Sequence, residues 1–128
     1  MAGNSWQQPV AGEPSCGTLH YCAFTQVLST DPSDTNIHAL DLSAVVPVGC
    51  KAVFIEARIA SATTAGRNLL IYASDGTTPQ WLVRNPIVSA SSWPGHGIAH
   101  LDANRNMYWQ ASSTDVSSVV IAVMGYFI

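Results

Sequence analysis

Short stretches in which hydrophobic and polar residues alternate follow one another along the chain, separated by clusters of turn-forming residues. The clearest stretch covers residues 51–60. One set of its alternate positions is apolar throughout, namely Val53, Ile55, Ala57 and Ile59. This period of two is typical of a β-strand with one buried face. Glu56 and Arg58 lie two residues apart on the opposite face, where an ion pair between them is expected.

Similar stretches predict strands on both sides of this one. They cover residues 21–28, 37–42, 69–73, 80–84, 87–90, 98–101 and 107–111. The Asp75-Gly76 pair is a strong turn signal, and Pro86 places an edge or a bend between two of the stretches. We expect residues 91–97, which contain Trp93, Pro94 and two glycines, to form a loop. We also expect 98–101 and 107–111 to pair as a hairpin across 102–106.

The last stretch, residues 118–128, is apolar on both of its faces. Val119, Ile121 and Val123 lie on one face, and Val120, Ala122 and Met124 lie on the other. A strand that is buried on both sides has this composition, so a central or interface strand is expected here.

The whole pattern predicts an all-β protein. Eight or nine short strands with frequent turns and no helical periodicity indicate an antiparallel β-sandwich, and a jelly-roll-like arrangement is the best single interpretation at this size. Residues 19–128 form this single domain. Residues 1–18 are rich in Gly and Pro and predict an extended N-terminal arm. Trp6, Pro9 and Pro14 are its candidate assembly contacts, on the interpretation that the arm lies on a neighbouring subunit. The alternative interpretation is that residues 1–18 are an unstructured tail.

The amino-acid composition indicates that the domain is part of a larger assembly. The chain of 128 residues is 48% hydrophobic but only 10% charged, whereas about a quarter of the residues in a soluble domain are usually charged. We therefore expect much of the surface to be covered by copies of the chain or by a larger assembly. The net charge of −3 and the five scattered cationic residues argue against nucleic acid and against a membrane surface. No signal peptide is recognisable, so synthesis in a cytosol is expected.

Candidate chemical sites are few. His96 and His100 would face the same side of an extended segment, and a metal site would need a third ligand from His20, His38 or Asp102. We expect no metal and no cofactor. Cys16, Cys22 and Cys50 are expected to be thiols, with a Cys16–Cys22 bridge left open.

No pattern supports catalysis, so we expect a protein without enzymatic activity. The chain has no nucleophile elbow, no phosphate-binding loop and no recognisable catalytic cysteine. Its aspartates lie mostly at predicted turns, where they ordinarily shape the backbone. Trp81, Trp93 and Trp109 are candidates for stacking on a sugar, although packing in a core or an interface is the more usual role of such rings.

The polar arm, the charge-poor sandwich and the closing strand ValValIleAlaValMetGlyTyrPheIle (119–128) resemble small structural proteins of tailed-bacteriophage virions. That group includes capsid cement proteins and fibre or tail-tip domains. The resemblance implies a jelly-roll homotrimer, assembled in the host cytoplasm, that acts as a cement or decoration protein on the major capsid protein. The alternative is a receptor-binding or tail-fibre head domain that recognises a host glycan. No functional residue carries over, because no diagnostic motif matches.

Overall fold

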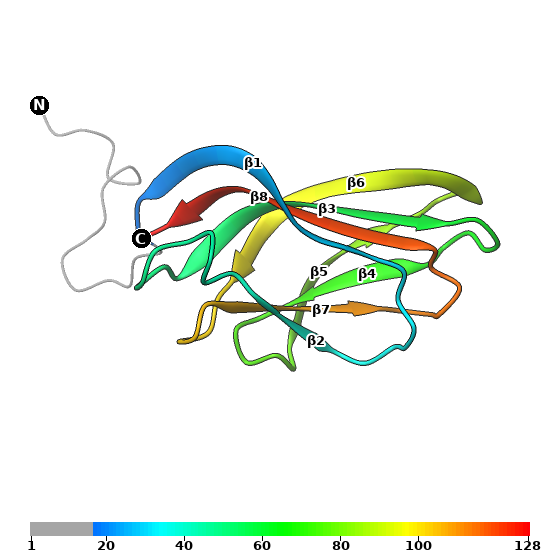
Figure 1. Ribbon diagram of the computed structural model, residues 1–128. Helices are drawn as coiled ribbons and strands as arrows, with labels where there is room; N and C mark the ends of the chain where they lie inside the picture. The colour runs from blue at the N-terminus through cyan, green and yellow to red at the C-terminus, as the bar shows by residue number, and fades with distance from the viewer. Residues whose placement is uncertain (1–16) are drawn as a thin grey trace, which may run out of the picture.

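The structure, a computed structural model, describes residues 17–128, which form eight β-strands and no helix (Figure 1). The strands are β1 (Leu19–Thr30), β2 (His38–Asp41), β3 (Ala52–Ser61), β4 (Asn68–Tyr72), β5 (Pro79–Arg84), β6 (Ser89–His100), β7 (Asn106–Ala111) and β8 (Ser118–Phe127). Within this part of the chain nothing helical is available to span a membrane. The predicted arm contacts Trp6, Pro9 and Pro14, and also Cys16, lie outside the described residues.

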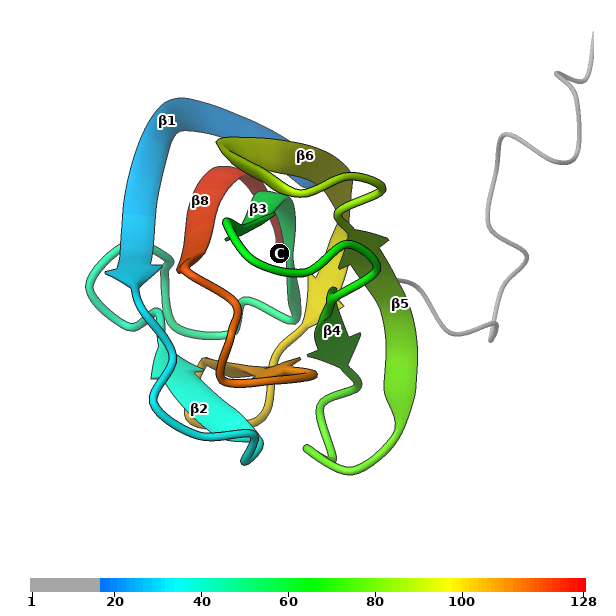
Figure 2. The ribbon, with the colours of Figure 1, turned by 90° about the vertical axis from the view of Figure 1, so that its right-hand side faces the viewer.

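The strands form two four-stranded antiparallel sheets that face each other as two layers (Figures 1 and 2). The first sheet has the order β1-β8-β3-β6, and the second has the order β2-β7-β4-β5. The predicted antiparallel β-sandwich is therefore confirmed. Strand pairing is nested along the chain, because β1 pairs with β8, β2 with β7, β3 with β6 and β4 with β5.

The core lies between the two sheets and is built from the alternate positions that the sequence pattern marks. Val53, Ile55, Ala57 and Ile59 of β3 are fully buried, as the period of two predicts. Leu69 and Ile71 of β4, with Met107 and Trp109 of β7, approach them from the second sheet. Burial of a Val, Leu or Ile side chain stabilises a fold by roughly 1.5–3 kcal/mol, so this layer is the main source of stability.

The predicted central position of the last strand is confirmed, because β8 lies between β1 and β3. Val119, Ile121 and Val123 point into the core. The register then shifts, since Ile55 pairs with Val123 and Phe54 pairs with Gly125. Met124 is the extra residue of this β-bulge, which turns the following Tyr126 toward the core.

The expected loop at residues 91–97 is wrong, since these residues form the middle of the long strand β6. The glycines that suggested a loop are needed by the packing. A Cβ atom on Gly95 would lie 2.6 Å from Val83 Cγ2, and one on Gly97 would lie 2.8 Å from the indole ring of Trp81. Pro94 is tolerated because β6 is an edge strand that pairs only with β3.

The predicted hairpin across residues 102–106 is also wrong. Residues 98–101 lie in or directly after β6 of the first sheet, whereas 107–111 lie in β7 of the second sheet. The turn itself exists, because the Asp102 N–H donates to the Asn106 carbonyl. It carries the chain from one layer to the other, which local patterning does not distinguish from a turn within one layer.

Candidate functional site

The outer face of the first sheet consists of four rows of residues that the strand register places side by side; we call it the first-sheet face. It is the side opposite the core positions of β3. Taken in the order β1, β8, β3, β6, the rows are Leu19, Phe127, Ala52 and His100; Tyr21, Gly125, Phe54 and Ile98; Gln26, Ala122, Glu56 and His96; and Ser29, Val120, Arg58 and Pro94.

The first two rows form a half of this face that is apolar except for His100. Tyr21 is 78% exposed and Ile98 is 43% exposed, while Phe54 and Phe127 are half-buried beside them. Phe24 is 58% exposed in the irregular part of β1, where Cys22, Ala23 and Phe24 interrupt the regular pairing with β8. Large apolar groups therefore remain in contact with solvent along one half of the sheet.

Tyr21 and Phe24 are surface residues that the sequence pattern did not predict. Strict alternation would turn Tyr21 and Phe24 toward opposite faces of one strand. The register shift between Tyr21 and Thr25 breaks that alternation and leaves both rings exposed. The only available signal was the absence of any charged residue in β1, which reads LHYCAFTQVLST.

Glu56 lies at the centre of the first-sheet face, between Arg58 and His96. The Nε of Arg58 donates to Glu56 Oε1, which confirms the predicted ion pair, and His96 Nε2 lies 2.9 Å from Glu56 Oε2. Only 11% of the Glu56 side chain is exposed. The hydrogen bond from Arg58 lowers the pKa of Glu56, with burial acting in the opposite direction and His96 adding to the decrease. The carboxylate charge is thus satisfied within the face.

This charge pairing makes the first-sheet face almost free of net charge. Glu56 and Arg58 are the only Asp, Glu, Lys or Arg residues in its four rows. Because each neutralises the other, the face offers neither an unpaired anion nor an unpaired cation to a ligand. Its chemistry suits contact with another apolar, neutral surface.

The outer face of the second sheet is mixed, because Leu70 and the exposed Leu82 lie on it beside several polar side chains. Tyr108 of β7 donates through its hydroxyl to Asp102 Oδ2 at 2.6 Å, and Gln110 donates to the Thr35 carbonyl at 2.6 Å. Burial raises the pKa of Asp102, but hydrogen bonds from Tyr108 and Asn106 outweigh it, and the net pKa is lowered. The same hydrogen bond raises the pKa of Tyr108. The polar part of this face is therefore arranged for water.

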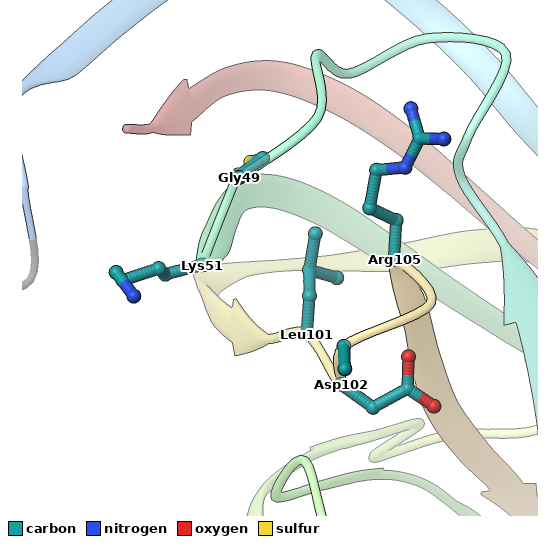
Figure 3. Close-up of a pocket in the computed structure, with 7 residues that line it drawn as sticks. Gly49, Lys51, Leu101, Asp102 and Arg105 are labelled. Carbon is teal, nitrogen blue, oxygen red and sulfur yellow. The ribbon is translucent and has the colours of Figure 1, made fainter.

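A small pocket of about 230 Å³ lies at one end of the sandwich, lined by residues that flank the starts of β3 and β7 (Figure 3). Two of its charged groups are already engaged, since Arg105 Nη1 donates to the carbonyls of Ser43 and Val46 and Asp102 Oδ1 accepts the Asn106 N–H of its own turn. Lys51 extends away from Arg105 (Figure 3), so the two cations do not converge on one point. The Cys50 thiol donates to the Ala52 carbonyl at 3.2 Å, and burial raises its pKa. A thiol of this kind is a poor nucleophile.

The three tryptophans proposed as sugar-stacking groups are turned inward. Trp109 is 5% exposed and stacks on His38, with ring centroids 4.9 Å apart. Trp93 lies opposite Ile59 and packs against the core. Trp81 also packs against the core, and its Nε1 donates to the Ile98 carbonyl at 2.9 Å, which joins β5 to β6. Their placement does not favour a platform for a glycan.

The histidines do not converge. His96 and His100 do face the same side of an extended strand, in different rows of the first-sheet face. His20 stacks on Tyr126 and His38 binds Asp34 at 2.7 Å, each away from His96. Over residues 17–128, no group of three or more His, Cys, Asp or Glu side chains could hold a metal ion.

The aspartates serve as turn formers, as expected. Asp41, Asp75 and Asp102 each accept the backbone N–H of the residue two positions later. Asp115 instead binds Arg67 through both carboxylate oxygens at 2.7 Å. This contact with Arg67 lowers the pKa of Asp115 and raises that of Arg67, so the pair links the loop before β4 to the loop before β8.

The first-sheet face is consequently the candidate functional site, and its chemistry is that of an interaction surface. Comparison with known proteins adds no family to this description: no protein-family model matches the chain, and no curated protein matches it significantly.

Proposed function

We propose that this chain is a non-enzymatic structural protein of a bacteriophage virion. In this role it is an oligomeric cement or decoration protein, a homotrimer, that binds the major capsid protein and stabilises the phage head. It is assembled in the host cytoplasm and carried in the virion. It acts by burying surface and uses no cofactor.

One observation carries this proposal: a nearly neutral, partly apolar sheet face on a chain with only 10% charged residues. Monomeric soluble proteins rarely expose large contiguous apolar patches, and such patches usually mark contacts with other proteins or membranes. A membrane surface would select clustered cations, but Arg58, the only Lys or Arg in the four rows, is already paired with Glu56. Protein partners therefore fit this surface best.

The nested strand pairing supports a jelly-roll assignment for the sandwich. Eight antiparallel strands in two four-stranded sheets, wound so that the first pairs with the last, are what a jelly roll requires. That fold is used repeatedly for viral capsid domains. A fold alone does not imply a function, so the jelly-roll arrangement is consistent with the proposed capsid role but is not the evidence for it.

The chemistry of the described residues agrees with a role without catalysis. Glu56 is engaged by Arg58 and His96, and the Cys50 thiol is buried with a raised pKa. A general base or a nucleophile would instead need a free group beside an open pocket. The alternative function, a glycan-binding fibre head, gains nothing from the inward-facing tryptophans.

The test is to locate the protein in particles. Antibodies raised against the recombinant chain should label the head of virions produced from the genome that encodes it, in many copies per particle. Deleting the gene should give heads that release their DNA at lower temperature. Label at the tail tip only, or virions without the protein, would refute a capsid role.

A further inference from the structure

We propose that the first-sheet face is a self-association surface, occupied in the assembled protein by a second copy of this chain. The inference rests on the self-association in the proposed function but gives a pair in place of the homotrimer, because a face that meets its own copy does so about a two-fold axis. It does not require any contact with a capsid.

The charge on the face favours an identical partner. Glu56 and Arg58 neutralise each other within one copy, so two such faces meet without a net like-charge repulsion. A nucleic acid, an acidic peptide or a strongly charged shell would find no unpaired charge to bind. The same neutrality means that bringing two faces together leaves no isolated ion to desolvate.

The size of the face also fits a stable pair. Four strands spaced about 4.8 Å apart, over the roughly 33 Å length of a ten-residue strand, give a projected area of about 630 Å². Stable protein interfaces bury about 800 Å² of accessible surface on each partner, and accessible area exceeds projected area on a surface with side-chain relief. The face is therefore large enough without the second sheet.

The edge strand β1 supplies an independent argument. Exposed edge strands are usually protected by charged residues or proline, because unprotected edges aggregate. The twelve residues of β1 contain no Asp, Glu, Lys, Arg or Pro, yet Tyr21 and Phe24 are exposed on it. The irregular pairing of β1 with β8 gives this edge some protection, but no charge or proline on it opposes a second chain. Tyrosine is also enriched among the residues that dominate interface energies.

The more polar face of the second sheet shows which of the two faces a second copy should cover. Tyr108, Gln110 and Asp102 already satisfy one another or nearby backbone groups, which water can continue to solvate. The first sheet presents Tyr21, Phe54 and Ile98 in one row, whereas Leu82 is the only large apolar side chain exposed in the strands of the second sheet. A second copy should accordingly cover the first sheet and leave the second sheet in solvent.

The experiment compares two matched substitutions in the full-length chain. Ile98→Asp places a charge on edge strand β6 within the face, and Leu82→Asp places the same charge on edge strand β5 of the second sheet. The two side chains have similar exposure, 43% and 50%. Sedimentation velocity from 1 to 100 µM should show an oligomer for the unmodified chain and for Leu82→Asp. Ile98→Asp should raise the dissociation constant by about 100-fold or more, because each interface then gains unpaired like charges.

Tyr21→Asp is the second variant, chosen because that side chain is largely exposed and its loss leaves the core intact. It decides the outcome if Ile98→Asp does not give the native circular dichroism spectrum. A monomeric unmodified chain at 100 µM would overturn the proposal. So would an oligomer that survives both variants in the first sheet, or one that Leu82→Asp dissociates equally.

Virion labelling separates this inference from the proposed function. If Ile98→Asp dissociates the oligomer but virions lack the protein, the capsid role fails and the self-association face stands. If virions carry the protein but both variants in the first sheet remain oligomeric, the face is wrong and the capsid role stands. If the unmodified chain is a monomer and Ile98→Asp abolishes only binding to particles, the shell occupies the face and the inference is refuted.

Discussion

Replacing Gly97 by alanine tests how the sandwich is closed along its β5–β6 side. Gly97 lies on the inner side of β6, directly against the indole ring of Trp81. An added Cβ would lie 2.8 Å from Trp81 Cε2 and Cζ2. Two carbon atoms pack best at about 3.5–4.0 Å, so the ring must move by roughly an ångström. The ring is not free to do so, because its Nε1 donates to the Ile98 carbonyl.

The expected cost follows from two opposing effects. Overpacking a core contact costs about 1–3 kcal/mol. Alanine recovers about 0.4–1 kcal/mol by restricting the unfolded chain. We therefore expect Gly97→Ala to lower the free energy of unfolding by about 1–2 kcal/mol. With an unfolding entropy of about 2.1 cal/mol/K per residue over roughly 110 residues, Tm should fall by about 4–8 °C.

Urea and thermal denaturation of Gly97→Ala, Trp81→Leu and the double variant measure this effect. Leucine removes the ring atoms that the new Cβ would meet, so Gly97→Ala should cost little in the Trp81→Leu background. The double-mutant cycle should then give a coupling free energy of about 1 kcal/mol. An unchanged Tm for Gly97→Ala, or an equal loss in both backgrounds, would show that Trp81 does not pack against Gly97.

Three further outcomes are expected. Val123→Asp should prevent folding, because an unpaired carboxylate would replace a side chain that is 1% exposed. The control Val48→Asp, on an exposed turn, should change Tm by less than about 2 °C. A soluble Val123→Asp protein with an unchanged Tm would contradict the central position of β8. The folded-state pKa of Asp115 is lowered, so its stabilisation is present above the ordinary aspartate pKa of about 3.9 and is lost as pH falls below it. Asp115→Asn should accordingly reduce Tm at pH 7, and its difference from the unmodified chain should shrink as pH falls from about 3.9 toward the lowered folded-state pKa; parallel pH profiles would refute this. In native protein, mass spectrometry should find alkylation of exposed Cys22 well before alkylation of buried Cys50, and equal rates would contradict the burial of Cys50.

Local patterning predicted the strands whose core positions can be recognised in their own sequence. The stretch at 51–60 became β3 almost unchanged, and the doubly apolar stretch at 118–128 became the central strand β8. In both cases the burial of a residue depends on its position in its own strand. A period of two therefore carries enough information.

The remaining features depend on contacts between distant residues. Gly95 and Gly97 suggested a loop because their local conformational freedom is visible, whereas the Val83 and Trp81 side chains that require them are more than ten residues away. The expected hairpin across 102–106 failed because no local signal shows that a turn changes sheet. The Glu56–Arg58 pair was predictable from alternation, but the His96 contact was not, since it depends on the register between β3 and β6.

The nested pairing of the strands also governs when the chain can fold during synthesis. β1 emerges first among the described strands, yet its only partner in the sheet is β8, the last of them. Closing this pair joins residues roughly a hundred positions apart, which makes folding slow compared with a protein of local contacts. A nascent chain that stops before β8 lacks the strand that connects β1 to β3. Incomplete chains are therefore excluded from the native fold and, with it, from any assembly that recognises the first-sheet face.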